Sequence, residues 1–313
     1  MNTICRFLGA VSSIFALGCS ADDPVRDQHP ERSTRAPVIY SVNYPLAYFA
    51  TRIVGEDANV VFPAPPNIDP ADWNPTPNEI AAFQTADLIL LNGPGHTRWV
   101  ERASLPSRKV LDASASFRDR LIELQDEINH MHGPEGTHVH ARTAKTTWLD
   151  PLLAIEQARA ITDALIRIRP QHSDAFLERF AALEADLHEL DARFTKAAEA
   201  IGDAPVLFSH PVYQYFERRY RVNGESVHWE PDAKPTPKMW RELAAIRSKH
   251  PAQLMVWEAA PREETILRLN SLGVSIVVLS PCANSPEGKD WYSVMLEGAE
   301  GLNEAGDQLL AGE

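Results

Sequence analysis

The chain has 313 residues, of which 44% are hydrophobic and 23% are charged. This composition is typical of globular proteins and excludes bulk disorder and a fibrous protein. The 43 Asp and Glu residues outnumber the 30 Lys and Arg residues, giving a formal net charge of -13, which argues against a nucleic-acid partner because phosphate backbones are bound by basic surfaces. The length exceeds that of a usual domain, about 100–200 residues, and predicts two lobes.

Residues 1–18 have the pattern of an export signal. A short segment that carries Arg6 is followed by an apolar stretch from Phe7 to Leu17, which is too short to cross a bilayer as a helix. The run Ala16-Leu17-Gly18-Cys19 is similar to a bacterial lipoprotein signal, in which cleavage leaves Cys19 to be acylated. The alternative is an ordinary secretory signal that is cut nearby. In both cases we expect an exported protein, and acylation of Cys19 would make it periplasmic and lipid-anchored to a membrane.

Residues 19–36 start at this cysteine and are polar, charged and Pro-containing, which predicts a flexible tether. Strands and helices then alternate, so residues 37–172 are predicted to form an N-terminal α/β lobe. The continuous apolar run at 87–92 is typical of a strand that is buried on both faces of a parallel sheet. The other elements predicted here are strands at 38–42 and 59–62, a helix opened by Pro45, and helices at 77–84 and 152–168.

A long linking helix is predicted over residues 173–200. Its large apolar residues recur at helical spacing, and they are Phe176, Phe180, Leu183, Leu187, Leu190 and Phe194. A second alternation of strands and helices predicts a C-terminal α/β lobe over residues 201–313. Its predicted elements are strands at 206–208, 254–257 and 274–279, and helices after Thr236-Pro237 and from about Arg262. The sequence therefore predicts an α/β fold with two α/β lobes, mostly parallel sheets, and one long helix that joins them.

Two features are rich in potential metal ligands. Residues 130–140 hold two His-x-His pairs on either side of a Gly-Pro turn, which offer His130, His132, His138 and His140. Imidazole suits Zn²⁺ and also Ni²⁺ or Cu²⁺. The alternative for this loop is a solvated polar segment that binds metal only adventitiously. The second feature is His210, which follows a predicted strand, where open parallel sheets present ligand-binding loops.

Several short motifs follow one another in a fixed order over about residues 37–310. They are Asp69-Pro70 with Pro75-Thr76-Pro77, Ala86 to Gly93, Trp148-Leu149-Asp150-Pro151, Ser209-His210-Pro211, Tyr215 to Tyr220, Glu230-Pro231 and Val277 to Pro281. Together they resemble the zinc/manganese-type solute-binding proteins of ABC importers. The resemblance implies two α/β lobes joined by a rigid long helix, a monomer, and a divalent metal bound in the cleft between the lobes for delivery to an ABC permease. Zn²⁺ is the expected metal, with Mn²⁺ or another divalent transition metal as alternatives.

The ligand positions of that family are largely changed in this chain. Of the family ligands, only His210 is present, because Ala71 and Thr146 stand where the family has histidine and Ser280 stands where it has aspartate. Alanine offers no donor atom, and a neutral hydroxyl is a poor substitute for imidazole or carboxylate. The family site therefore cannot form here without replacement ligands.

The candidate replacement ligands fall into three groups. His138 or His140 would take the role lost at Thr146 if the His-rich loop, with His130 and His132, folds into the cleft. His228 stands where the family commonly has glutamate, although a lone histidine near a strand end is often a hydrogen-bonded structural residue. The carboxylates of Asp72 and Glu258 are further candidates, and Glu258 could instead cap a helix or pair with an arginine.

The preferred hypothesis is an extracytoplasmic substrate-binding component that captures zinc between its lobes. The alternative is a metal-buffering or interaction lipoprotein on the same fold that binds metal only weakly, through the His-rich loop. A metallohydrolase would need three metal ligands, an open coordination position and a general base. Neither a His-Glu-x-x-His motif nor a Gly-x-Ser-x-Gly motif occurs, so we expect no enzymatic activity.

Overall fold

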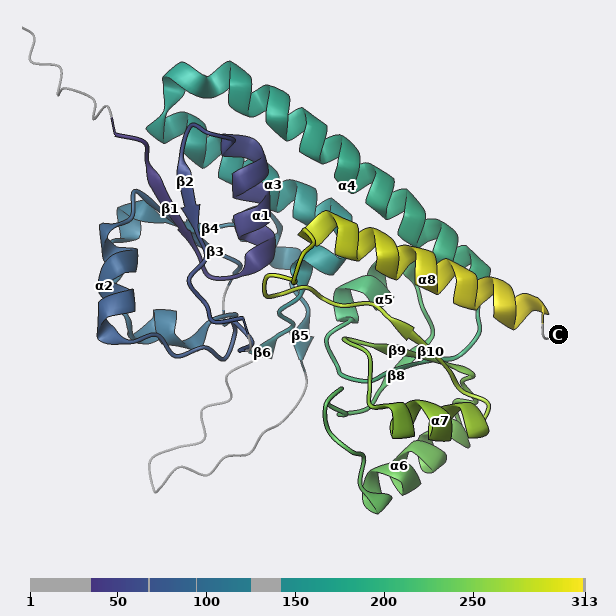
Figure 1. Ribbon diagram of the computed structural model, residues 1–313. Coiled ribbons are helices and arrows are strands. Elements are labelled where there is room, and N and C mark those ends of the chain that lie inside the picture. Colours follow the sequence, from purple (N-terminus) through teal and green to yellow (C-terminus); the bar gives the residue numbers. More distant parts are fainter. Residues whose placement is uncertain (1–34, 67, 94, 125–141, 312–313) are drawn as a thin grey trace, which may run out of the picture. The chain divides into compact units, whose positions relative to one another are not determined.

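The computed structural model describes residues 35–66, 68–93, 95–124 and 142–311 (Figure 1). The predicted signal, Cys19 and all but the end of the predicted tether lie outside these ranges. Within them, strands and helices alternate along most of the chain and build two separate four-stranded sheets. None of the described helices combines the length and the apolar character that a membrane span needs.

The N-terminal sheet has the strand order β2-β1-β3-β4, and all its strands are parallel. The strands are β1 (Val38–Ser41), β2 (Asn59–Val61), β3 (Leu88–Leu91) and β4 (Val110–Asp112). Helices α1 (Tyr44–Val54), α2 (Pro77–Thr85) and α3 (Pro151–Ile168) belong to this lobe. Each has proline in its first turn and a side-chain N-cap, from Asn43, Thr76 and Asp150 respectively, which explains why these helices begin where they do. The antiparallel pair β5 (Glu123–Leu124) and β6 (Arg142–Thr143) stands apart from the sheet.

The C-terminal sheet has the order β10-β9-β7-β8 and is also fully parallel. Its strands are β7 (Val206–Phe208), β8 (Gly224–Ser226), β9 (Leu254–Trp257) and β10 (Ser275–Val278). The helices of this half are α5 (Gln214–Tyr220), α6 (Pro237–Arg247), α7 (Glu263–Ser271) and α8 (Trp291–Ala311). Central strands β7 and β9 are buried along their whole length, as expected for a parallel sheet that is covered on both faces.

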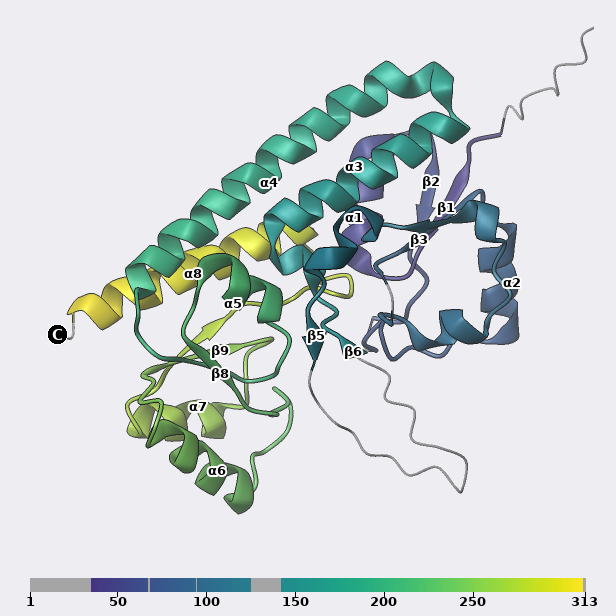
Figure 2. The same ribbon diagram turned by 180° about the vertical axis from the view of Figure 1, so that it is seen from behind.

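Helix α4 (Ser173–Ile201) links the two halves and packs against α3 and α8 (Figures 1 and 2). All six apolar residues that predicted this helix are buried. The approach of α8 is close at Gly306, where an added Cβ would lie 2.7–2.8 Å from backbone and side-chain atoms of Ala200. The prediction of two α/β lobes joined by one long helix is thus confirmed.

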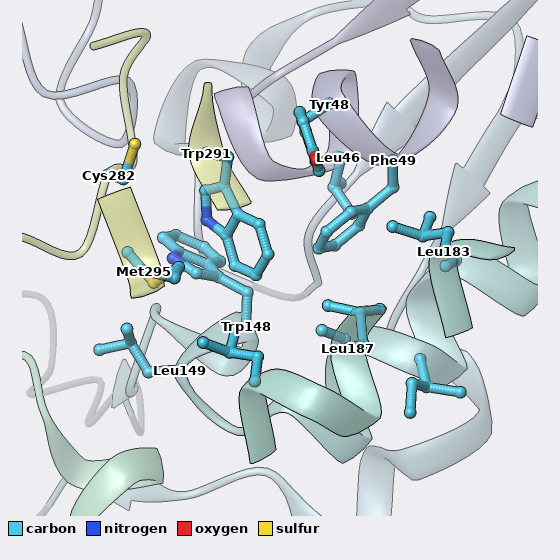
Figure 3. Packing of buried hydrophobic residues seen from close by; sticks show 14 of the residues in the cluster. Leu46, Tyr48, Phe49, Trp148, Leu149, Leu183, Leu187, Cys282, Trp291 and Met295 are labelled. Atoms are coloured by element: carbon cyan, nitrogen blue, oxygen red, sulfur yellow. The ribbon is translucent and has the colours of Figure 1, made fainter. Parts of the chain in front are cut away.

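One hydrophobic cluster runs from the N-terminal lobe through α4 into the C-terminal lobe. Figure 3 shows part of it, where the rings of Phe49 and Trp291 meet edge to face at 5.1 Å. Trp148 is buried in the same cluster, and its indole Nε1 donates a hydrogen bond to the carbonyl oxygen of Pro281, at 2.7 Å. The backbone N–H of Tyr44 donates to the carbonyl oxygen of Ala283, at 2.9 Å. The two lobes therefore share a core and are also joined by hydrogen bonds to the segment 281–283.

Candidate metal centre

The topology of the C-terminal sheet gathers polar side chains at one edge. His210 comes two residues after β7, Glu258 directly follows β9, and His228 and Glu230 follow β8. Because these strands are parallel neighbours, their carboxyl ends meet at the same edge of the sheet. The pairing continues past the strands, since the N–H of Ser209 donates to Val256 and the N–H of Trp229 donates to Ser209.

His210 is at the centre of this group. Its Nδ1 atom lies 3.6 Å from Oε1 of Glu230 and 3.8 Å from Oε1 of Glu258. Its ring centroid is 5.7 Å from that of His228. Both N···O distances are too long for hydrogen bonds, and Nδ1 is buried with no hydrogen-bond partner among the described residues. In a tetrahedral zinc site with bonds of about 2.0–2.1 Å, neighbouring ligand atoms lie about 3.3–3.4 Å apart, so these separations are slightly wider than those of a formed site.

The electrostatics of the group favour a bound cation. Burial, together with the smaller effects of the charges of Glu230 and Asp69, raises the pKa of Glu258 to about 7. Burial lowers the pKa of His210, and the nearby His228 lowers it as well. The negative charges of Glu230 and Asp69 oppose this change but do not cancel it. A neutral imidazole is the form that binds metal. A divalent cation would relieve the repulsion among the carboxylates and the desolvation of Glu258.

The three positions where the resemblance predicts ligands that this chain lacks make other contacts. Ala71 is buried, and its N–H donates to Oδ1 of Asp69 at 2.8 Å. The hydroxyl of Thr146 donates to the carbonyl oxygen of Val212, and the hydroxyl oxygen of Ser280 accepts a hydrogen bond from the N–H of Cys282. Ala71 and Ser280 therefore take part in local contacts, whereas Thr146 contacts the other lobe.

The other candidate ligands from the sequence are not among the described members of the group around His210. Asp72 is exposed and faces Lys145, with 3.8 Å between Oδ1 and Nζ. His130, His132, His138 and His140 lie outside the described residues. Across the ranges that are described, no set of three or more His, Cys, Asp or Glu side chains is already arranged to hold a metal ion. The group around His210 is thus a cluster of potential ligands rather than a closed coordination sphere.

Glu230 and Asp69 are the members of this group that the sequence analysis named only as parts of motifs and not as candidate ligands. A signal for Glu230 was present, because His228 and Glu230 are two residues apart on an extended segment and so lie on the same side of it. Val227 and Trp229 between them are buried, while His228 and Glu230 are exposed. Asp69 carried no comparable signal, since it reaches the group from the N-terminal lobe.

Comparisons with known proteins support the family resemblance. Residues 39–305 match the family described as zinc-uptake complex component A, periplasmic (ZnuA). The zinc-binding lipoprotein AdcA of Streptococcus pneumoniae is 23% identical over 319 residues, covering 98% of this chain and 62% of that protein. The high-affinity zinc uptake system protein ZnuA of Bacillus subtilis is 26% identical over 218 residues, covering 69% of this chain and 68% of that protein. The chain thus spans about three fifths of the length of AdcA.

Solved structures share the fold. The Zn(II)-bound ZnuA-like domain of S. pneumoniae AdcA superposes with a TM-score of 0.72 at 21% identity, covering 88% of this chain and 100% of that domain. The metal-dependent lipoprotein YcdH of B. subtilis gives a TM-score of 0.71 at 21% identity and covers 86% of this chain and 99% of that one. The family model covers most of the chain, and the chain therefore belongs to the ZnuA family of periplasmic zinc-uptake components.

Proposed function

We propose that this chain is the extracytoplasmic solute-binding component of an ABC importer and that its cargo is Zn²⁺. The observation that carries this proposal is the buried Nδ1 of His210, which has no hydrogen-bond partner among the described residues and faces two carboxylates. Imidazole and carboxylate together suit zinc. The zinc-binding relatives support the choice of cargo, and their family is one of transport components rather than enzymes.

Export and anchoring belong to the same proposal. Cleavage before Cys19 and its acylation would tether the protein to a membrane, next to the permease that receives the metal. A relative that is named a lipoprotein supports this interpretation.

Isothermal titration calorimetry with zinc tests the proposed function. We expect binding tighter than micromolar, and a loss of at least tenfold in affinity for His210→Ala, because the variant lacks the central ligand. His188→Ala is the matched control, since His188 is exposed on α4. Absence of zinc binding by the unmodified protein would refute the proposal. Deletion of residues 130–140 distinguishes the alternative: if that deletion abolishes binding while His210→Ala is harmless, the protein is a buffer that binds through its loop.

A further inference from the structure

The residues at the family ligand positions are engaged elsewhere, so a cation must be held by a different set of side chains. Thr146 uses its hydroxyl to bond the opposite lobe at Val212, and Ser280 uses its hydroxyl to hold the N–H of Cys282. Ala71 has no donor atom. Among the family ligand positions only His210 keeps a metal-binding side chain.

We infer that the metal site has moved onto the C-terminal lobe, where His210, Glu230 and Glu258 form a mixed imidazole–carboxylate site with His228 beside it. This inference rests on the proposed function and assigns the ligands of that site. Its cargo is a divalent cation that accepts both nitrogen and oxygen donors, as Zn²⁺ does. The separations of 3.6 and 3.8 Å between Nδ1 of His210 and the two glutamate oxygens are slightly wider than the spacing of about 3.3–3.4 Å between ligand atoms of one zinc ion.

Glu258 gives the strongest argument. Its side chain is only 27% exposed, and Nδ1 of His210 lies 3.8 Å from its Oε1 atom. No Lys or Arg in the described ranges forms an ion pair with it. Buried carboxylates are normally hydrogen-bonded, paired or coordinated to a metal. A cation shared with His210 satisfies the carboxylate and the orphaned Nδ1 atom together.

Packing and a backbone hydrogen bond of Trp229 fix the segment that carries His228 and Glu230. Trp229 is 2% exposed and packs edge to face on Trp240, with 4.8 Å between ring centroids. Its backbone N–H donates to Ser209 at 2.7 Å, directly before His210. Burial of Trp229 forces its two neighbours to the opposite side of the extended segment. The fold therefore presents His228 and Glu230 toward His210 without any contribution from the other lobe.

A site built on one lobe has a mechanistic consequence. Ligands that all come from the strand ends of one sheet can bind and release metal while the hydrogen bond from Thr146 to Val212 stays formed. Asp69 is the contribution of the N-terminal lobe: its charge acts on Glu258, and its Oδ1 atom accepts a hydrogen bond from the N–H of Ala71.

The test compares isosteric amides in zinc titrations of the full chain. Glu258→Gln is expected to weaken zinc binding at least tenfold, and Glu230→Gln about three- to tenfold because this side chain is 61% exposed. Asp69→Asn removes the same charge without removing a ligand, and it should weaken binding less than threefold. Glu263→Gln, at an exposed position of α7, should have no effect.

X-ray absorption of the zinc-loaded protein adds a direct readout, because loss of a ligand removes an oxygen neighbour at about 2.0–2.2 Å, whereas loss of a remote charge does not. The inference is overturned if the unmodified protein binds zinc and Glu258→Gln binds it equally well, or if Asp69→Asn weakens binding as much as Glu258→Gln. Failure of the unmodified protein to bind zinc would instead refute the proposed function. Circular dichroism and thermal unfolding confirm that each variant is folded.

Discussion

The hydroxyl of Thr146 donates a hydrogen bond to the carbonyl oxygen of Val212, which joins the two lobes at a position where the family resemblance predicts a metal ligand. Thr146 is 7% exposed, and Val212 is half-buried. An unpaired buried acceptor costs about 1–3 kcal/mol. The contact between Thr146 and Val212 thus stabilises the association of the lobes.

Thr146→Val should therefore destabilise the protein by about 1–3 kcal/mol, because valine has the same shape and cannot donate to Val212. Urea unfolding followed by circular dichroism measures this loss. Thr162→Val is the matched control, since the buried hydroxyl of Thr162 bonds Ala158 within helix α3 and that carbonyl keeps its helical partner. Equal losses for both variants would mean that the contact between the lobes contributes nothing specific. Zinc affinity should be unchanged in Thr146→Val if the site lies on one lobe.

The sequence predicted the elements whose signal is local. The spacing from Phe176 to Phe194 identified α4, because burial of one helix face leaves a periodic pattern. The apolar run at 87–92 identified β3, because burial of both strand faces leaves a continuous apolar run. Helix α8 was missed, since Gly298, Gly301 and Gly306 weaken any intrinsic preference for a helix. Its packing against α4 and β10 decides its structure.

The candidate site likewise has parts with a local sequence signal and parts that depend on tertiary contacts. His210 and Glu258 could be proposed because both follow predicted strands, and parallel strands bring their carboxyl ends together. The bond from Thr146 to Val212 could not be predicted, since it joins residues that are 66 positions apart. The influence of Asp69 on Glu258 likewise depends on how the lobes meet, which no local pattern records.

Gly306→Ala should destabilise the protein by about 1–3 kcal/mol, although alanine favours helices more than glycine does. The new methyl group would lie 2.7–2.8 Å from Ala200 and from the backbone N of Ile201, so α8 would have to move away from α4. Thermal unfolding measures the effect. Gly301→Ala is the comparison, because only one side-chain atom of Val277 lies close to its added methyl group and that side chain can adjust. A larger loss for Gly301→Ala would show that the contact between α4 and α8 is less tightly packed than the structure indicates.

Glu217→Gln should stabilise the protein relative to the unmodified chain at pH 8 and have little effect at pH 4. Burial, with a smaller effect of Glu225, raises the pKa of Glu217 from 4.5 to about 7 in the folded state. The favourable contribution of this group is therefore fully present below pH 4.5 and is lost as the pH rises through 7. Because glutamine carries no charge, the variant should gain about 1–3 kcal/mol over the unmodified protein at pH 8 and little at pH 4.

Urea unfolding at both pH values measures this difference. Glu225→Gln should give a smaller gain at pH 8, because it removes only the lesser cause of the shift. A gain of the same size at pH 4 and pH 8 would rule out deprotonation of Glu217 as its origin.

Cys282 should react slowly with alkylating reagents in the folded protein. Its side chain is buried, and burial, with a smaller effect of Asp290, raises the pKa of the thiol to about 12. At pH 8 the reactive thiolate is therefore scarce, and we expect labelling at least about a hundredfold slower than in urea. Mass spectrometry of the peptide that contains Cys282 measures the rate.

Labelling of Cys282 also reports separation of the lobes, because its neighbours Pro281 and Ala283 accept hydrogen bonds from Trp148 and Tyr44 of the other lobe. Thr146→Val should accelerate it, whereas Thr162→Val should not, and fast labelling of the unmodified native protein would contradict the burial of this thiol.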